Sequence, residues 1–477
     1  MKKLIALLCL LAICLPLCAC GGSGLEAVEE TKTETKTEEA AETGPITYPD
    51  TFAVGYAIGD ITCTTPLTMY NAVADRIHDP LMLTVTAFSD GEGNVALVMS
   101  ADLKGMHRPV FERTTEIIEE KFGIKPENVI LSCTHTHSAP TVGESNAEVT
   151  RWAPIYYKTF PAIVEKALRD LDPLEGAYIG KSVAEGISFV RRYLLADGTY
   201  KMNPGSSDNP VEHESVADPE LRAIRFERGD KKDILMVNWQ CHAAHGRSDH
   251  KTWISSDFIC NLRNGVEKEM DVHFSYHNGA SGNLNFTNKT GPQKANYEVA
   301  GKELVGVVKE TVKNEEKVNT GKIKSAKSTV NVEVIQDSPE RIEGAKAFNS
   351  ASEMEQPTVL AKYNLISSYE VSAINARQSY GGPTTDIALY AISFGDIVFT
   401  TAPFEQFDSD AVAVRAASPF KMTFTCAYSN GANGYLPSTL AYPHGSYEVY
   451  TTYFEMGTSD RIVAGQIALI NQLASAS

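Results

Sequence analysis

The sequence has 477 residues, of which 43% are hydrophobic, and it carries a formal net charge of −17 at pH 7. This length and apolar content are enough for a large core, in one large domain or in two closely packed ones. The acidic balance and the lack of a basic patch argue against nucleic acid and electrostatically bound anionic lipid as partners.

Residues 1–19 have the features of a secretory signal peptide. Two lysines precede an apolar run that ends near Leu17 and is shorter than the roughly 20 residues of a membrane-spanning helix. The tetrapeptide LCAC at 17–20 resembles a bacterial lipobox, in which the cysteine becomes the lipidated N-terminus. We therefore predict a lipid on Cys20, which holds an extracytoplasmic protein on the bacterial cell membrane. An ordinary cleaved signal with a chance cysteine is the alternative.

Residues 20–46 are predicted to form an acidic, disordered tether that begins with the lipidated cysteine. Between 25 and 43 the chain is rich in glutamate and has almost no apolar side chains. Such a segment cannot bury enough surface to offset the entropy lost on ordering. The remaining residues, 47–477, are predicted to form the folded domain.

The first chemically suggestive stretch lies where a predicted strand ends. Residues 107–123 have apolar side chains at helical spacing and stop at Gly123, and residues 126–133 then form a short apolar run. His135 and His137 follow directly. In an extended segment, residues two apart point to the same side, so both imidazoles face one way. Binding sites in open α/β sheets lie beyond the carboxyl ends of strands.

The same arrangement recurs further along the chain. Residues 221–239 and 388–402 each form two predicted strands around a Gly-Asp turn. His242 follows the first pair of strands, and Glu405 follows the second. A weaker strand signal precedes Tyr435. Each of these side chains is therefore expected at the exit of a strand, where a packed sheet holds it and leaves its tip exposed.

Two histidines and a carboxylate that converge around an open position form the ligand set of a catalytic zinc site. Hydrogen-bonded core histidines and a surface glutamate would give the same pattern without chemistry. A histidine pair after a strand also begins the metal site of amidohydrolase barrels. Those barrels need a regular eightfold alternation of strands and helices, whereas the sequence indicates hairpins.

The run CTHTHSAP, residues 133–140, is similar to the THTHSGP signature of the neutral ceramidases and their bacterial relatives. The resemblance continues in order over roughly residues 50–470, through VGYAIGDIT, DPLMLTVTAF, VALVMSADL, CHAAHG, ISSDF, NGASGNLNF, APFEQF, NGANGYLPS and SYEV. It implies the fold of that family's N-terminal catalytic domain. This is an α/β fold with mixed β-sheets flanked by helices, in a single large domain without the C-terminal immunoglobulin-like domain of the larger ceramidases.

The resemblance also implies roles for individual residues. The Zn²⁺ ligands that it implies are His135, His242, Glu405 and Tyr435. His137 would face the scissile carbonyl as a catalytic residue, and Tyr435 would also take part in catalysis as a movable ligand. Arg191 falls where the family has an Asn-Arg pair that helps to hold substrate, although the asparagine is Val190 here. A surface arginine is the alternative for that position.

The sequence departs from the family pattern in the glycine-rich loop. Where ceramidases have GDVSPN, this chain has Gly282-Asn283-Leu284-Asn285-Phe286, so asparagines replace the aspartate and the serine. Phe404 replaces a further glycine of the family pattern next to Glu405. These departures put ceramide itself in doubt as the substrate and leave the metal ligands intact.

The remaining cysteines and histidines have no assigned chemistry. Of nine cysteines, those beyond the leader show no CxxC spacing, which argues against a disulfide framework and a thiolate zinc site. We expect them to be small buried residues. His277 and the pair His78 and Asp79 are candidates for the pocket wall only. Residues 321–380 contain strand-like and helical pieces but indicate no chemistry.

We therefore predict a secreted, lipid-anchored hydrolase that uses zinc-activated water to cleave an amide bond in an N-acyl lipid or a related amide. Through the resemblance, this activity would belong to sphingolipid metabolism. The alternative is a non-catalytic surface lipoprotein with a degenerate, ligand-binding pocket. No protein partner and no nucleic acid are predicted.

Overall fold

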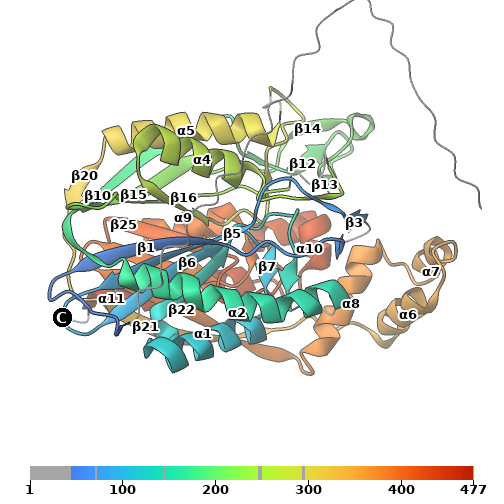
Figure 1. Ribbon diagram of the computed structural model, residues 1–477. Helices are drawn as coiled ribbons and strands as arrows, with labels where there is room; N and C mark the ends of the chain where they lie inside the picture. Colours follow the sequence, from blue (N-terminus) through green and yellow to red (C-terminus); the bar gives the residue numbers. More distant parts are fainter. Residues whose placement is uncertain (1–43, 70–71, 144–145, 245–249, 293–295, 476–477) are drawn as a thin grey trace, which may run out of the picture. The chain divides into compact units, whose positions relative to one another are not determined.

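The computed structural model describes residues 44–69, 72–143, 146–244, 250–292 and 296–475 (Figure 1). Residues Ile46–Ser477 form one compact unit. The predicted signal peptide, Cys20 and the tether up to residue 43 lie outside the described residues and stay predictions. Within the described part of the chain, no helix has both the length and the apolar character needed to cross a membrane.

The larger sheet has nine strands, in the order β18-β16-β15-β10-β1-β5-β6-β8, with β20 paired to β10. Its strands are β1 (Ala53–Asp60), β5 (Met82–Ser89), β6 (Val95–Ala101), β8 (Val129–Cys133), β10 (Asp172–Val183), β15 (Glu220–Arg228), β16 (Ile234–Trp239), β18 (His273–Asn278) and β20 (Glu316–Val318). Most neighbours are antiparallel, but the two edge pairs, β6 with β8 and β16 with β18, are parallel. The predicted hairpin of β15 and β16 is confirmed.

The second sheet has four strands, in the order β21-β22-β23-β25. They are β21 (Lys324–Glu333), β22 (Thr384–Phe394), β23 (Ile397–Ala402) and β25 (Met422–Ala427). β22 and β23 form the predicted hairpin, whereas β23 and β25 are parallel. The two sheets pack face to face through a shared apolar core that includes Phe88, Phe226 and Phe394. The ring centroids of Phe88 and Phe394 lie 4.7 Å apart.

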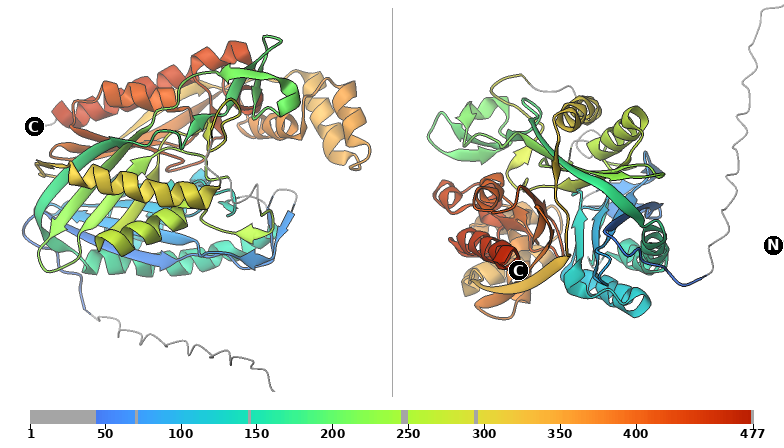
Figure 2. Two further views of the ribbon diagram at one scale, coloured as in Figure 1. Left: turned by 90° about the horizontal axis from the view of Figure 1, so that it is seen from above. Right: turned by 90° about the vertical axis from the view of Figure 1, so that its left-hand side faces the viewer.

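Helices cover the outer faces of both sheets, so the unit has helix, sheet, sheet and helix layers (Figure 2). The nine-stranded sheet is covered by α1 (Arg108–Phe122), α2 (Ala147–Arg169), α4 (Phe258–Met270) and α5 (Tyr297–Lys313), and the four-stranded sheet by α9 (Asp408–Ala416) and α11 (Thr458–Ser475). α1 ends at the predicted Gly123, whose φ of 69° is left-handed, a conformation that glycine adopts without strain. The predicted α/β fold with mixed sheets flanked by helices is confirmed.

Short elements complete the unit. The short strands are β2 (Leu67–Met69), β3 (Ala72–Ala74), β4 (Arg76–Ile77), β7 (Gly105–Met106), β9 (Thr141–Val142), β11 (Phe189–Val190), β12 (Arg192–Leu195), β13 (Tyr200–Met202), β14 (Pro210–His213), β17 (Trp253–Ile254), β19 (Leu284–Asn285), β24 (Glu405–Gln406) and β26 (Tyr435–Leu436). The remaining helices are α6 (Pro339–Ser350), α7 (Gln356–Lys362), α8 (Ser368–Ser379) and α10 (Tyr447–Thr451), with 3₁₀ turns η1 (Pro126–Asn128), η2 (Ser206–Asp208) and η3 (Thr439–His444). α6, α7 and α8 share a small apolar cluster of their own.

Asp410, in the first turn of α9, is a buried carboxyl that makes stability depend on pH. Burial raises the pKa of Asp410 to about 8, with contributions from Asp460 and Asp408. Its Oδ2 is buried and has no hydrogen-bond partner among the described residues. In the unfolded chain the pKa of an aspartate is about 3.9. Because the folded pKa is the higher one, this contribution to stability is complete below about pH 4 and is lost as the pH rises towards 8.

We therefore expect Asp410→Asn to stabilise the protein relative to the wild type, by an amount that grows from pH 4 to pH 8. At pH 8 the gain should be on the order of a few kcal/mol, because each unit of pKa shift corresponds to about 1.4 kcal/mol. Urea unfolding of both proteins at several pH values measures it. A difference that does not change with pH would contradict the assignment.

Candidate metal centre and active site

The carboxyl ends of strands from both sheets meet at one place. The backbone N–H of Cys133, at the end of β8, donates to the carbonyl of Tyr428 at 3.1 Å, and the N–H of Asn430 donates to the carbonyl of Leu131 at 3.0 Å. These bonds join the edge of the nine-stranded sheet to the segment that follows β25. β24 and β26 pair in parallel there, with Glu405 opposite Tyr435. The strand exits singled out in the sequence therefore converge.

His135 and His242 are held with the same ring nitrogen turned inward. The Nδ1 of His135 lies 2.7 Å from the carbonyl oxygen of Lys104, and the Nδ1 of His242 lies 2.8 Å from that of Ser281. A carbonyl only accepts, so each Nδ1 carries a proton, and a neutral ring in this tautomer has its lone pair at Nε2. The two Nε2 atoms lie 3.2 Å apart. Burial, followed by the charge of Arg191, lowers the pKa of His242 to about 3, which keeps that ring neutral.

Glu405 adds a carboxylate to the two lone pairs. Its Oε2 lies 3.4 Å from the Nε2 of His135 and 3.4 Å from the Nε2 of His242. This oxygen is buried and makes no hydrogen bond to any described residue. Two ring nitrogens and one carboxylate oxygen, all of which can bind a cation, therefore face one another.

This triad, His135, His242 and Glu405, fits a zinc ion. Zinc bonds to histidine and carboxylate are about 2.0–2.1 Å long, so the ligand atoms at the corners of a zinc tetrahedron lie about 3.3–3.4 Å apart. The three distances in the triad are 3.2, 3.4 and 3.4 Å. Nitrogen and oxygen donors of this kind suit Zn²⁺, and a cation between them would remove the repulsion of the facing lone pairs.

His137 lies beside the triad. Its Nε2 is 3.2 Å from the Nε2 of His135, and the ligand nitrogens of His135, His137 and His242 all lie within 4.8 Å of one another. The backbone N–H of His137 donates to the carbonyl of Ala243 at 2.8 Å, which ties the two histidine segments together. Burial and the neighbouring His135 lower the pKa of His137 well below its usual range.

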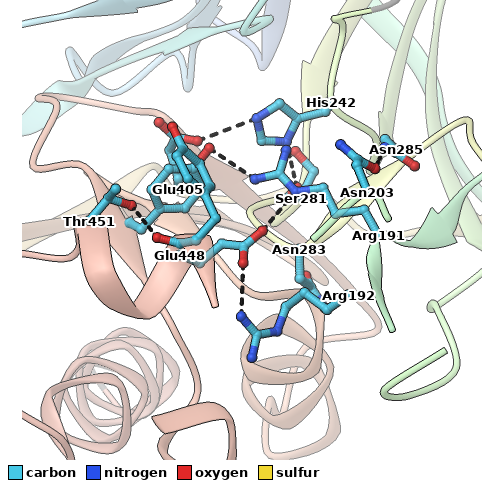
Figure 3. A network of polar contacts seen from close by, with 12 residues as sticks. Arg191, Arg192, Asn203, His242, Ser281, Asn283, Asn285, Glu405, Glu448 and Thr451 are labelled. Carbon is cyan, nitrogen blue, oxygen red and sulfur yellow. Dashed lines mark hydrogen bonds and ion pairs between the residues drawn. The ribbon is translucent and has the colours of Figure 1, made fainter. Parts of the chain in front are cut away.

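Arg191 lies beside His242 and Glu405 (Figure 3). The ring of Tyr435 is stacked against that of His242, with centroids 6.5 Å apart. The side chain of Arg191 is buried, so the alternative of a surface arginine is wrong. Its Nη2 donates to the Tyr435 hydroxyl at 2.9 Å, and its Nε donates to Oε1 of Glu448 at 2.9 Å. Burial raises the pKa of Tyr435 well above its usual range, although Arg191 opposes that effect. Tyr435 is thus a neutral phenol, held in place by a cation.

Comparisons with known proteins place the fold. No family model and no curated protein matches the sequence. Among solved structures, the neutral ceramidase from Pseudomonas aeruginosa matches with a TM-score of 0.68 and 17% sequence identity, covering 89% of this chain and 74% of that one. A ceramidase complexed with C2 matches with a TM-score of 0.66 and 16% identity, covering 89% and 75%. The chain has the neutral ceramidase fold. The resemblance seen in the sequence is confirmed at the level of the fold.

Tyr428 belongs to the candidate site of this neutral ceramidase fold, but the sequence did not indicate it. Its ring stacks on the imidazole of His135, with centroids 3.9 Å apart and planes at 18°. Its hydroxyl is hydrogen-bonded to the Ser281 hydroxyl at 2.8 Å. His135 and Tyr428 both adopt left-handed backbone conformations, with φ of 64° and 52°. Backbone strain of this kind in non-glycine residues is commonly found at functional sites. In the sequence, the one signal for Tyr428 is that it lies in a polar turn after a predicted strand.

The substituted glycine-rich loop has a structural role. Asn283 donates from Nδ2 to Oδ1 of Asp408 at 2.8 Å, and its Oδ1 accepts from the backbone N–H of Asp408 at 3.1 Å. Asn285 donates to Oδ1 of Asn203 at 2.7 Å. Both asparagines therefore fix neighbouring segments of this chain.

Gly282 packs directly against the backbone of Glu405. A Cβ at this position would lie 2.2 Å from the carbonyl oxygen of Glu405, a distance that real contacts do not reach. The N–H of Gly282 also donates to the carbonyl of Gln406 at 2.8 Å. Only glycine lets the loop and β24 approach this closely.

We expect Gly282→Ala to displace Glu405 and to weaken zinc binding by at least about 10-fold, the lower end of what changes around metal ligands cost. A zinc titration against a competing chelator measures this affinity. Gly306→Ala is the matched control: a Cβ there meets nothing within 4 Å, and the position lies inside helix α5. That variant should bind zinc normally, and equal affinities in the two variants would contradict the proposed packing role.

The other polar candidates fall outside the centre. His277 is buried and bonded to the hydroxyls of Ser132 at 3.1 Å and Ser275 at 3.0 Å, which makes it a core residue. Asp79 accepts from the Ser255 hydroxyl at 2.6 Å and so fixes the segment that follows β17. His78 is exposed and stacks on Trp253. The five described cysteines are free, and all except Cys260 are buried, as expected.

Proposed function

We propose that the protein is a zinc-dependent amide hydrolase. The observation that carries the proposal is the triad of two unprotonated imidazole nitrogens and one orphaned carboxylate oxygen, spaced like three corners of a zinc tetrahedron. His135, His242 and Glu405 would hold the ion, and Tyr435, paired with Glu405 across β24 and β26, would be the fourth ligand. A zinc ion bound there would polarise the substrate carbonyl and lower the pKa of water towards 7.

The chain's own residues would position the substrate and move the proton. His137 would accept a proton from the attacking water and pass it to the departing amine nitrogen, a role that suits an imidazole beside the metal ligands. Arg191 would hold the Tyr435 hydroxyl towards the centre, because its guanidinium is fixed by Glu448 at the opposite end. Tyr428, stacked on His135, would keep that ring in its orientation.

We further propose that the substrate is an N-acyl lipid or a related amide, and that the enzyme acts outside the cytoplasm, anchored to a bacterial membrane through a lipid on Cys20. The lipobox-like LCAC sequence supports the anchor. The likeness in fold to a neutral ceramidase supports the amide class and a place in sphingolipid metabolism. The different glycine-rich loop supports an amide other than ceramide.

The test is a hydrolysis screen with the purified full-length protein. N-acyl amides with different amine parts are incubated with zinc-loaded protein, with protein treated with a chelator, and with treated protein to which zinc is returned. We expect release of free amine in the first and third samples only. If zinc-loaded protein binds these amides and releases no amine, the proposal fails and the ligand-binding lipoprotein becomes the better interpretation.

A further inference from the structure

A pocket of about 140 Å³ opens onto the triad, and Lys104 lines it. His135 and Glu405 form part of the same lining. Lys104 lies just before the short strand β7, which pairs with β9. Its backbone carbonyl holds the Nδ1 of His135, so the lysine is fixed next to a proposed metal ligand. The side chain is half-buried.

The positive charge of Lys104 lies close to the reacting groups. Lys104 lines the same pocket as His135 and Glu405, and its backbone carbonyl oxygen lies 2.7 Å from the Nδ1 of His135. Among the described residues that line this pocket, Glu405 is the one carboxylate, and the proposed metal would neutralise it. The pocket would then present a net positive wall to a substrate.

A second cavity of about 340 Å³ continues from the first and shares Asn433 and Tyr453 with it. Its wall is polar and fixed: the Tyr380 hydroxyl donates to Oδ1 of Asn433 at 3.1 Å, and Nδ2 of Asn433 donates to the carbonyl of Pro403 at 3.1 Å.

Large apolar side chains are scarce around both cavities. Within the described lining, Phe404 and Ile387 are the large aliphatic or phenyl side chains, and the other residues are tyrosine, polar, glycine, alanine or proline. Two long hydrocarbon chains need a predominantly apolar pocket. A compact, charged amine part fits these cavities better.

We propose that Lys104 is a specificity residue that binds a carboxylate carried on the amine part of the substrate, so that the preferred substrates are N-acyl amino acids. The inference rests on the proposed function. In that scheme His137 protonates the departing nitrogen, and Lys104 would bind the carboxylate carried on the same part of the substrate. The reaction consumes one water: the C–N bond breaks, the acyl carbon gains the oxygen as a carboxylate, and the nitrogen leaves with the proton as an amino acid.

The test compares N-hexanoylglycine with N-hexanoylethanolamine, which differ in a carboxylate against a neutral hydroxymethyl group. Zinc-loaded full-length protein is assayed for kcat/KM on each compound, and binding of each is measured by calorimetry. We expect the wild type to favour the glycine conjugate by about 10-fold or more, the usual effect of a charge-assisted hydrogen bond. Lys104→Met should bring the ratio of the two kcat/KM values and the ratio of the two affinities close to one. Lys104→Arg should keep most of the preference for the glycine conjugate.

Lys309→Met is the matched control, because Lys309 is half-exposed on α5 and pairs with Glu269. It should leave both ratios unchanged. The inference is overturned if the wild type shows no preference, or if the preference survives Lys104→Met. Tighter binding of the glycine conjugate without hydrolysis of either compound would support the carboxylate site and contradict the proposed amide hydrolase. Hydrolysis of both compounds at equal rates would contradict the carboxylate site and support the proposed amide hydrolase.

Discussion

The His137→Ala variant is expected to keep its bound zinc and to lose about 10²- to 10⁴-fold in kcat for amide hydrolysis, the usual contribution of a general acid-base group. His135, His242 and Glu405 form a closed triangle with sides of 3.2 to 3.4 Å, and the Nε2 of His137 lies 3.2 Å from the Nε2 of His135, outside that triangle. The three proposed zinc ligands are therefore expected to stay in place when His137 is removed. Zinc content and kcat are measured on the same preparation.

His135→Ala is the informative comparison, because it removes a corner of the triangle and should lose both zinc and turnover. His250→Ala is the control for histidine replacement: this exposed ring stacks on Trp253, and its loss should change neither quantity. Loss of zinc from His137→Ala would make His137 a ligand and would contradict its proposed role. Full turnover in His135→Ala would contradict the metal centre itself.

Glu448→Ala is expected to lower the free energy of unfolding by about 3–5 kcal/mol, the usual cost of removing one partner from a buried ion pair. The side chain of Glu448 is fully buried, and its two oxygens accept from Arg191 at 2.9 Å and from Arg192 at 2.8 Å. Its removal takes this counter-charge from the buried Arg191 and leaves the buried Arg192 with Glu214 as its carboxylate partner. Arg191 also loses the contact that fixes it on Tyr435, so catalysis should fall as well.

Urea unfolding of metal-free protein measures this effect without a contribution from zinc binding. Glu112→Ala is the matched control, because Glu112 forms an exposed ion pair with Arg108 on α1, with about half of each side chain accessible to solvent. Such pairs contribute roughly 0–1 kcal/mol. Equal destabilisation by the two variants would contradict the structural role of Glu448.

The strand exits could be predicted from the sequence because local patterns specify them. Apolar runs that end in polar residues gave β8, β16 and β23, and Gly-Asp turns gave the two hairpins. Side chains alternate between the two faces of an extended segment, so His135 and His137, two residues apart, could be predicted to lie on the same side of the chain. The convergence of these exits could be expected from the general behaviour of sheets, but the distances between the ligand atoms could not.

Contacts between distant segments gave no sequence signal. Glu448 meets Arg191 across 257 positions, and Tyr428 covers His135 from a different sheet. The closeness of Gly282 to Glu405 likewise appears only once the loop and β24 are side by side. In each case the role depends on how two sheets pack together, which the periodicity of either segment does not encode.

The most direct test of the zinc centre is elemental analysis by mass spectrometry of the purified protein after dialysis without chelator, alongside His135→Ala and His242→Ala. We expect about one zinc per chain in the wild type and none in either variant, because each variant removes one corner of the tetrahedral set. A wild-type protein that holds no zinc and takes up none from solution would contradict the metal centre, and with it the hydrolytic mechanism.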